Sequence, residues 1–209
     1  MKSTITIEQQ QNIKHVVDKM HLAKGMGTKE NACSIAAINL ALTGKLTDDI
    51  PECMSYILGR WIIKMQDIMP DSVRNSVEWK DLLPLAAGTG RAKEDKIAKA
   101  LLDHIWTIVL PYIQPLADKQ GYGKEWLHMT TVKTKKAANA YAYASAASAY
   151  AYASAAKAAS AYAACANAAA ACAAASAYAA CADAYAHFWQ HINMTALLAK
   201  LINICQQDD

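Results

Sequence analysis

The spacing of apolar residues indicates helices along most of the chain. Near the start, Thr6 followed three residues later by Gln9 is a capping-box pattern, and apolar positions then recur on one face. This predicts a first helix that ends near His21. From Glu30 a second helix is expected, because the run NACSIAAINLAL that follows it is apolar nearly all round, which is typical of a buried helix.

The third predicted helix lies between a polar cap and a proline. We expect Thr47 or Asp48 to cap it, with Pro51 in its first turn, where the missing N–H is harmless. Its apolar face continues to Ile68, and Pro70 ends it.

Further prolines divide the next segments. A short helix after Pro70 is expected to end at Pro84. The following helix is expected to begin at Arg91, and Pro111 and Pro115 end or kink it.

The chain closes with an amphipathic helix at 196–205, after a turn at 193–195. Because no alternation typical of a strand occurs, the predicted class is all-α, a compact bundle of about seven or eight helices. We expect a single domain over 1–209, with a mixed helical part at 1–123 and an Ala/Tyr-rich helix and the closing helix at 124–209.

The segment from 137 to 186 is the most unusual part of the chain. It contains 31 Ala in 50 residues and no Gly or Pro, so it predicts a long helix. Its all-Ala flanks allow close helix packing, which indicates a central or arm-like helix and is compatible with a homo-oligomer. Unbroken, it would span about 75 Å, so we expect a bend near Asn167 or a protruding arm. Its weak hydropathy argues against a membrane span.

Charge and cysteine usage exclude little. The net charge of +3 is small, and the positive excess lies at 124–136, so an anionic partner is conceivable but nucleic acid is not expected. The six cysteines form no CxxC pair, and the first twenty residues carry no signal-peptide pattern. We therefore expect reduced thiols and a cytoplasmic protein.

Three glycine loops place a cation next to a predicted helix start, where unsatisfied N–H groups attract anions. They are Gly25-x-Gly27-Thr28-Lys29, Gly88-x-Gly90-Arg91 with Lys93, and Gly121-x-Gly123-Lys124. Each could hold a phosphate or a carboxylate. The alternative is that the glycines make tight turns and the cations only face solvent.

Aromatic residues extend this theme, because rows of Tyr beside Ser could stack on a base, although aromatics at helical spacing are more often core. The candidate ligand-binding residues are Lys29, Arg60, Arg91, Lys93, Tyr122, Lys124, Trp126, Tyr141 and Tyr150.

Asp183, His187 and His191 lie at i, i+4 and i+8 of a predicted helix and could present a carboxylate and two imidazoles to a metal. The alternative is helix-terminal histidines favoured by the helix dipole. Other acid and base groups, such as Asp103 with His104, are adjacent charges without a nucleophile motif. We therefore expect neither an enzyme nor a cofactor, and keep a metal-dependent hydrolase that uses Asp183, His187 and His191 as a less favoured hypothesis.

The segments ENACSIAAINLALTG, IPECMSYILGRWIIKMQD and LLPLAAGTGR, followed by an Ala/Tyr-rich helix and a closing LLAKLI, resemble a set of phage and bacterial proteins. The resemblance covers most of the chain and assigns no site residues. It implies a phage accessory protein or a bacterial conflict protein, acting in the cytoplasm, which is the host cytoplasm for a phage protein.

Together these patterns predict a non-enzymatic protein that sequesters a small anionic, nucleotide-type ligand and counters host immune signalling. The alternative is a structural or interaction protein that oligomerises through the Ala/Tyr-rich helix and binds a host protein rather than a small ligand.

Overall fold

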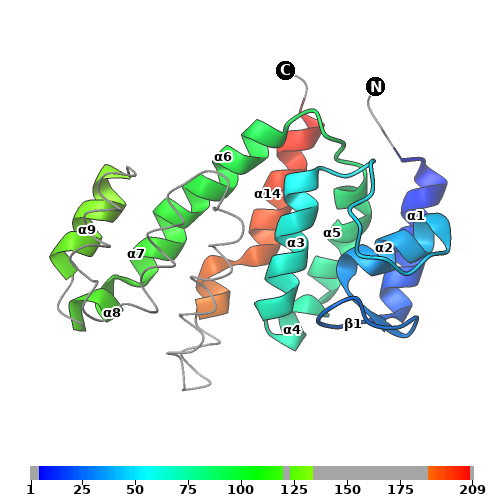
Figure 1. The fold of residues 1–209 in the computed structure, drawn as a ribbon, viewed down its shortest axis with the longest axis horizontal. Coiled ribbons are helices and arrows are strands. Elements are labelled where there is room, and N and C mark those ends of the chain that lie inside the picture. Colours follow the sequence, from blue (N-terminus) through cyan, green and yellow to red (C-terminus); the bar gives the residue numbers. More distant parts are fainter. Residues whose placement is uncertain (1–4, 120–122, 134–187, 208–209) are drawn as a thin grey trace. The chain divides into compact units, whose positions relative to one another are not determined.

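Residues 5–119, 123–133 and 188–207 are described by the structure, a computed structural model (Figure 1). The fold class is all-α, as the apolar spacing predicts. The chain divides into unit 1, Met1–Ile97 with Asn193–Asp209, and unit 2, Ala98–Ile192. That the whole chain forms one domain stays a prediction. The Ala-rich helix and its expected bend at Asn167 lie outside the described residues.

The elements follow each other in chain order. Unit 1 contains α1 (Ile7–Lys19), β1 (His21–Leu22), β2 (Asn31–Ala32), α2 (Ser34–Thr43), α3 (Tyr56–Ile68), α4 (Asp71–Arg74), α5 (Val77–Ala87) and α14 (Met194–Gln206). The helix α6 (Glu94–His104) begins in unit 1 and continues in unit 2. Unit 2 also contains the π-helix η1 (Ile105–Val109), α7 (Leu110–Tyr112), α8 (Gln114–Lys119) and α9 (Gly123–Val132).

The capping box predicted at the start of α1 is confirmed. The backbone N–H of Gln9 donates to Oγ1 of Thr6 at 3.1 Å, and the backbone N–H of Thr6 donates to Oε1 of Gln9 at 2.9 Å. These two bonds satisfy donors that have no partner inside the helix. Further along, the ammonium group of Lys14 lies 2.9 Å from Asp81, so α1 is also tied to α5.

Several predicted helix starts are wrong. α2 begins at Ser34 rather than at Glu30, because residues 31–32 instead pair with residues 21–22 as a short parallel ladder. α3 begins at Tyr56 with Ser55 as its cap, not at Thr47 or Asp48. The hydroxyl of Thr47 instead bonds within the preceding loop, where it donates to Oδ2 of Asp49 at 2.7 Å.

The prolines act less uniformly than expected. Pro84 does not end α5, which continues to Ala87. Pro84 is buried, as are Leu83 and Ala86 near it in the helix, so core packing offsets the hydrogen bond that proline removes. Pro111 does mark an interruption, since the π-helix directly precedes α7, and α8 begins one residue before Pro115.

The core of unit 1 joins segments that are distant in sequence. The rings of Trp61 and Trp79 lie with their centroids 6.2 Å apart, and Nε1 of Trp79 donates to Oγ of Ser34 at 3.3 Å. α14, red in Figure 1, packs against α5 and buries Leu198 and Leu201 completely. The C-terminal helix is therefore part of the same core as α1 to α5.

None of the helices among the described residues is long and apolar enough to cross a membrane.

Candidate functional site

The first turn of α3 already holds an anion, which comes from the protein itself. The backbone N–H groups of Tyr56 and Ile57 donate to the carboxylate of Glu94 at 2.6 and 3.1 Å. Oγ of Ser55 also donates to this carboxylate at 2.8 Å and accepts from the N–H of Leu58 at 3.1 Å. Glu94 therefore occupies the position at a helix N-terminus that attracts negative charge.

The glycine loop at 88–91 is docked on the same turn. Ser55 donates its backbone N–H to Oγ1 of Thr89 at 3.0 Å, and Gly90 donates its own to the carbonyl of Cys53 at 2.8 Å. Gly90 has a φ of +60°, a left-handed conformation that glycine adopts without a steric penalty. α6 begins only at Glu94, so the expected helix start at Arg91 is wrong and the loop is longer than predicted.

This docking places Arg91 over an exposed aromatic ring. The guanidinium carbon of Arg91 lies 5.8 Å from the centroid of the Tyr56 ring, within the range of a cation–π contact. The Tyr56 residue is 51% exposed. An aromatic ring with a cation against it therefore faces solvent at the start of α3.

Two further cations lie in this region. Arg60 follows Tyr56 by four residues on α3, so the two share a helix face, and Arg60 is exposed. Lys93 donates from Nζ to the carbonyl of Gln207, the C-cap of α14. We call Tyr56, Arg60, Arg91 and Lys93 the aromatic–cation patch. Within the described part of the chain, neither arginine of the patch forms an ion pair with a carboxylate.

The thiol nearest in sequence to this patch is not activated. Burial raises the pKa of Cys53, although its own backbone hydrogen bond and the positive charge of Arg91 oppose the rise. A thiol with a raised pKa is protonated at neutral pH and is a poor nucleophile. Cys53 therefore does not add covalent chemistry to the patch.

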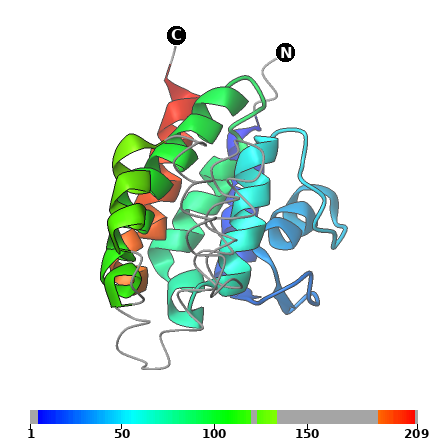
Figure 2. The same cartoon turned by 60° about the vertical axis from the view of Figure 1, so that its left-hand side comes forward.

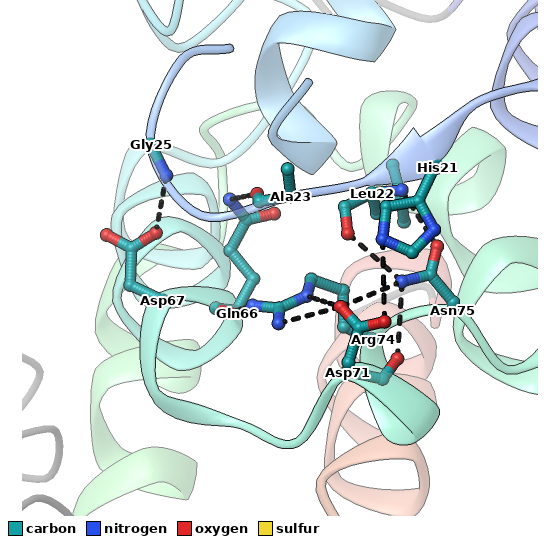
Figure 3. Close-up of polar contacts among 9 residues, drawn as sticks. All are labelled: His21, Leu22, Ala23, Gly25, Gln66, Asp67, Asp71, Arg74 and Asn75. Carbon is teal, nitrogen blue, oxygen red and sulfur yellow. Dashed lines mark hydrogen bonds and ion pairs between the residues drawn. The ribbon is translucent and has the colours of Figure 1, made fainter. Parts of the chain in front are cut away.

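Lys29 lies with a different part of unit 1. Its loop, residues 23–31, is held at the last turn of α3, where Gly25 donates its N–H to Oδ1 of Asp67 at 3.1 Å and Gln66 donates from Nε2 to the carbonyl of Ala23 at 3.3 Å (Figure 3). Figure 2 shows this loop, in blue, at the edge of unit 1.

The structure therefore separates two sequence candidates that looked alike. Gln66 follows Tyr56 by ten residues, about 15 Å along α3, so Lys29 and Arg91 belong to opposite ends of this helix. The glycine-loop pattern predicts Lys29 in the first turn of the second helix. This is wrong, because Lys29 lies five residues before the start of α2.

A polar network around the buried side chain of Arg74, which the sequence analysis did not single out, lies next to this second loop (Figure 3). Arg74, only 4% exposed, donates from Nε and Nη2 to Oδ1 of Asp71 at 3.3 and 3.0 Å. The other oxygen of Asp71 lies 3.4 Å from Nε2 of His21. The i, i+3 spacing of Asp71 and Arg74 was visible in the sequence, but the partner of Asp71 on β1 was not.

The described candidates in unit 2 do not form one exposed group, because one is in the core and another is on the surface. Trp126 is 1% exposed and donates from Nε1 to the carbonyl of Leu110 at 2.8 Å, so its ring serves the core. Lys124 is exposed in the first turn of α9. His191 stacks on Tyr112 with centroids 4.5 Å apart. The remaining candidates, Tyr122, Tyr141, Tyr150, Asp183 and His187, lie outside the described residues.

Among residues 5–119, 123–133 and 188–207, no three His, Cys, Asp or Glu side chains gather closely enough to hold a metal ion. Since two of the three residues of the sequence-based metal hypothesis fall outside these ranges, that hypothesis stays a prediction.

No protein-family model matches the chain, and neither a curated protein nor a solved structure matches it. The resemblance to phage and bacterial proteins thus stays a prediction. A function has to be argued from the side chains themselves.

Proposed function

We propose that this protein binds a small anionic, nucleotide-type ligand at the aromatic–cation patch and releases it chemically unchanged. The observation that carries the proposal is the position of the Arg91 guanidinium group over the half-exposed ring of Tyr56, with Arg60 on the same face of α3.

The side chains of the patch match the two parts of a nucleotide. A guanidinium group donates paired hydrogen bonds to phosphate oxygens and also stacks on planar rings. A tyrosine ring offers a surface for a base, and such stacking is worth about 1 to 3 kcal/mol per base. Because the arginines are exposed, their attraction for phosphate is screened by salt, and affinity should fall as ionic strength rises.

Glu94 changes how the phosphates would be held. Sequence reasoning assigns them to backbone N–H groups at the start of the helix that follows the glycine loop. In the structure the helix start beside Tyr56 is that of α3, and its N–H groups at Tyr56 and Ile57 are bonded to Glu94. Recognition of the anion therefore falls to the arginine side chains. This arrangement favours ligands with two or more negative charges, since Glu94 offsets one of the three cations in the patch.

In a biological setting, such a protein would lower the free concentration of a nucleotide signal in the cytoplasm. This role agrees with the sequence resemblance to phage proteins that act in conflict with their hosts. Self-association through the Ala/Tyr-rich segment is compatible with it.

The first test is native mass spectrometry of the purified protein, alone and after incubation with linear and cyclic nucleotides. A nucleotide mass that is retained or acquired supports the proposal. A defined oligomer that takes up none of them overturns it and favours the alternative, an interaction protein that assembles through the Ala/Tyr-rich segment.

The second test locates the binding site by titration calorimetry with a nucleotide that binds. Arg91→Ala and Arg60→Ala should each weaken binding by about 10- to 100-fold, the effect of losing hydrogen bonds to a charged group. Lys24→Ala is the matched control, because it removes one exposed positive charge next to Gly25, at the other end of α3. If all three variants bind equally, the patch is not the site.

A further inference from the structure

We infer that Thr89 and Glu94 are positioning residues, which hold Arg91 over Tyr56 without touching the ligand themselves. The expected effect on ligand binding rests on the proposed function. The expected effect on the position of Arg91 concerns the protein without a ligand. The feature that suggests it is the way in which the segment from 89 to 94 is fastened to the first turn of α3 on both sides of Arg91.

The two anchors lie on either side of the arginine. Before it, Oγ1 of Thr89 accepts the N–H of Ser55 at 3.0 Å. After it, the carboxylate of Glu94 accepts from the hydroxyl of Ser55 and from two backbone N–H groups of α3. The residues between the anchors are thereby confined to a short span on the surface of α3.

Glu94 also fixes the residue on which Arg91 rests. Its Oε1 accepts the backbone N–H of Tyr56 at 2.6 Å, while the ring of the same tyrosine contacts Arg91. The two members of the cation–π pair are therefore attached to one carboxylate, Tyr56 through its backbone and Arg91 through three intervening peptide units. A binding surface that is ordered before the ligand arrives loses less conformational entropy on binding.

A purely electrostatic role of Glu94 and a positioning role predict opposite effects of Glu94→Gln on the binding of an anion. If Glu94 were only a nearby negative charge, Glu94→Gln would remove repulsion and tighten the binding of an anion. A glutamine amide, however, replaces one acceptor oxygen with an N–H donor, and this donor faces groups that are themselves donors. At least one bond to α3 is lost, Arg91 becomes less ordered, and anion binding weakens.

The first arm of the experiment measures ATP binding by titration calorimetry. Glu94→Gln should bind ATP about two- to tenfold more weakly than the wild type, the effect of ordering a flexible side chain on binding. Asp95→Asn is the matched control, because Asp95 is the exposed neighbour in the first turn of α6 and the charge change is the same. It should bind ATP as tightly as the wild type or more tightly.

The second arm needs no ligand and follows the NMR signal of the Nε–H group of Arg91, which the Tyr56 ring shifts. In Glu94→Gln and in Thr89→Val, this signal should move toward its position in Tyr56→Leu, whereas in Asp95→Asn it should not move. Thr89→Val removes the hydroxyl that accepts from Ser55 and donates to the carbonyl of Ala86 at 2.8 Å, and it keeps the size of the side chain. Since it leaves Glu94 in place, this variant tests the idea even if Glu94→Gln folds poorly.

The outcomes separate the two proposals. If the Arg91 signal is unchanged in Glu94→Gln and Thr89→Val, the positioning role is wrong whatever binds. Tighter ATP binding by Glu94→Gln would also overturn it and would assign Glu94 a purely electrostatic effect. If the wild type binds no nucleotide but the signal moves as expected, the positioning of Arg91 stands and the proposed function fails.

Discussion

Asn75 pairs with the backbone of Leu22 as a neighbouring strand would. Its Oδ1 accepts the N–H of Leu22 at 2.8 Å, and its Nδ2 donates to the carbonyl of Leu22 at 3.0 Å. One side chain thus satisfies both polar groups of a β1 residue whose own side chain is fully buried.

We expect Asn75→Ala to destabilise the protein by about 1 to 3 kcal/mol, because it leaves both backbone groups of Leu22 without this partner. Urea unfolding followed by circular dichroism measures the change. Asn203→Ala, on the exposed side of α14, is the control and should stay within about 0.5 kcal/mol of the wild type. Equal losses in the two variants would contradict the role of Asn75.

Two glycines with nearly the same φ angle should respond differently to alanine. Gly27 and Gly44 have φ values of +77° and +72°. A Cβ atom at Gly27 would overlap the backbone of Asn31 and Ala32, whereas one at Gly44 has no neighbour within 4 Å. Gly44→Ala should therefore cost only the left-handed strain, about 1 kcal/mol, and Gly27→Ala distinctly more. Thermal unfolding of both variants tests this, and equal melting temperatures would be inconsistent with the tight turn at 27–32.

The Tyr56 ring should matter for binding more than for folding. Tyr56→Ala should weaken the binding of ATP by about tenfold or more, since it removes the stacking surface, while Tyr56→Phe keeps the ring and should stay close to the wild type. Because the residue is half exposed, the melting temperature of the empty protein should change little. If Tyr56→Ala and Tyr56→Phe bind equally, the ligand does not stack there.

Cys205 should make stability fall at alkaline pH. Burial, with a contribution from Glu94, raises the pKa of its thiol from 9.0 to about 11, although Lys93 opposes the rise. Above about pH 9 the unfolded chain loses this proton while the folded protein keeps it, so the free energy of unfolding decreases as pH approaches 11. Below about pH 9 the thiol is protonated in both states and has no such effect.

The comparison is between urea unfolding of the wild type and of Cys205→Ala, at about pH 8 and at about pH 10.5. The wild type should lose more stability over this interval than the variant does. Parallel losses would show that Cys205 is not shielded from water in the folded protein. The other thiols are common to both proteins and cancel in the comparison.

Local sequence was a sound guide where neighbouring residues decide the structure. The Thr6 and Gln9 capping box lies where the pattern placed it. The turn before the closing helix is found at Asn193, whose side chain accepts the N–H of Ala196 at 3.1 Å, although α14 begins at Met194, two residues before the predicted start. Local sequence was a poor guide at Pro84, where it predicts the end of a helix that in fact continues to Ala87. The helix tolerates this proline because Pro84 is buried, and that burial depends on helices elsewhere in the chain.

The candidate site was predicted only in part. Arg60 and Arg91 were both among the candidates. The structure places Arg91 over Tyr56 and Arg60 one helical turn after it on α3, whereas Tyr56 itself was not a candidate. Nothing in the sequence near Tyr56 showed that the loop at 88–91, more than thirty residues later, would bond to the first turn of α3. Equally, nothing near Lys29 showed that its glycine loop would join two short strands instead of starting a helix.

The sequence by itself determined the all-α class and the capping box of Thr6 and Gln9, because helix propensity, capping and apolar spacing act within one or two turns of chain. Only the tertiary structure decided which anion lies at the start of α3 and which cation lies on Tyr56. Glu94 reaches Tyr56 across 38 residues, and such a contact depends on how the intervening segments pack rather than on any local preference.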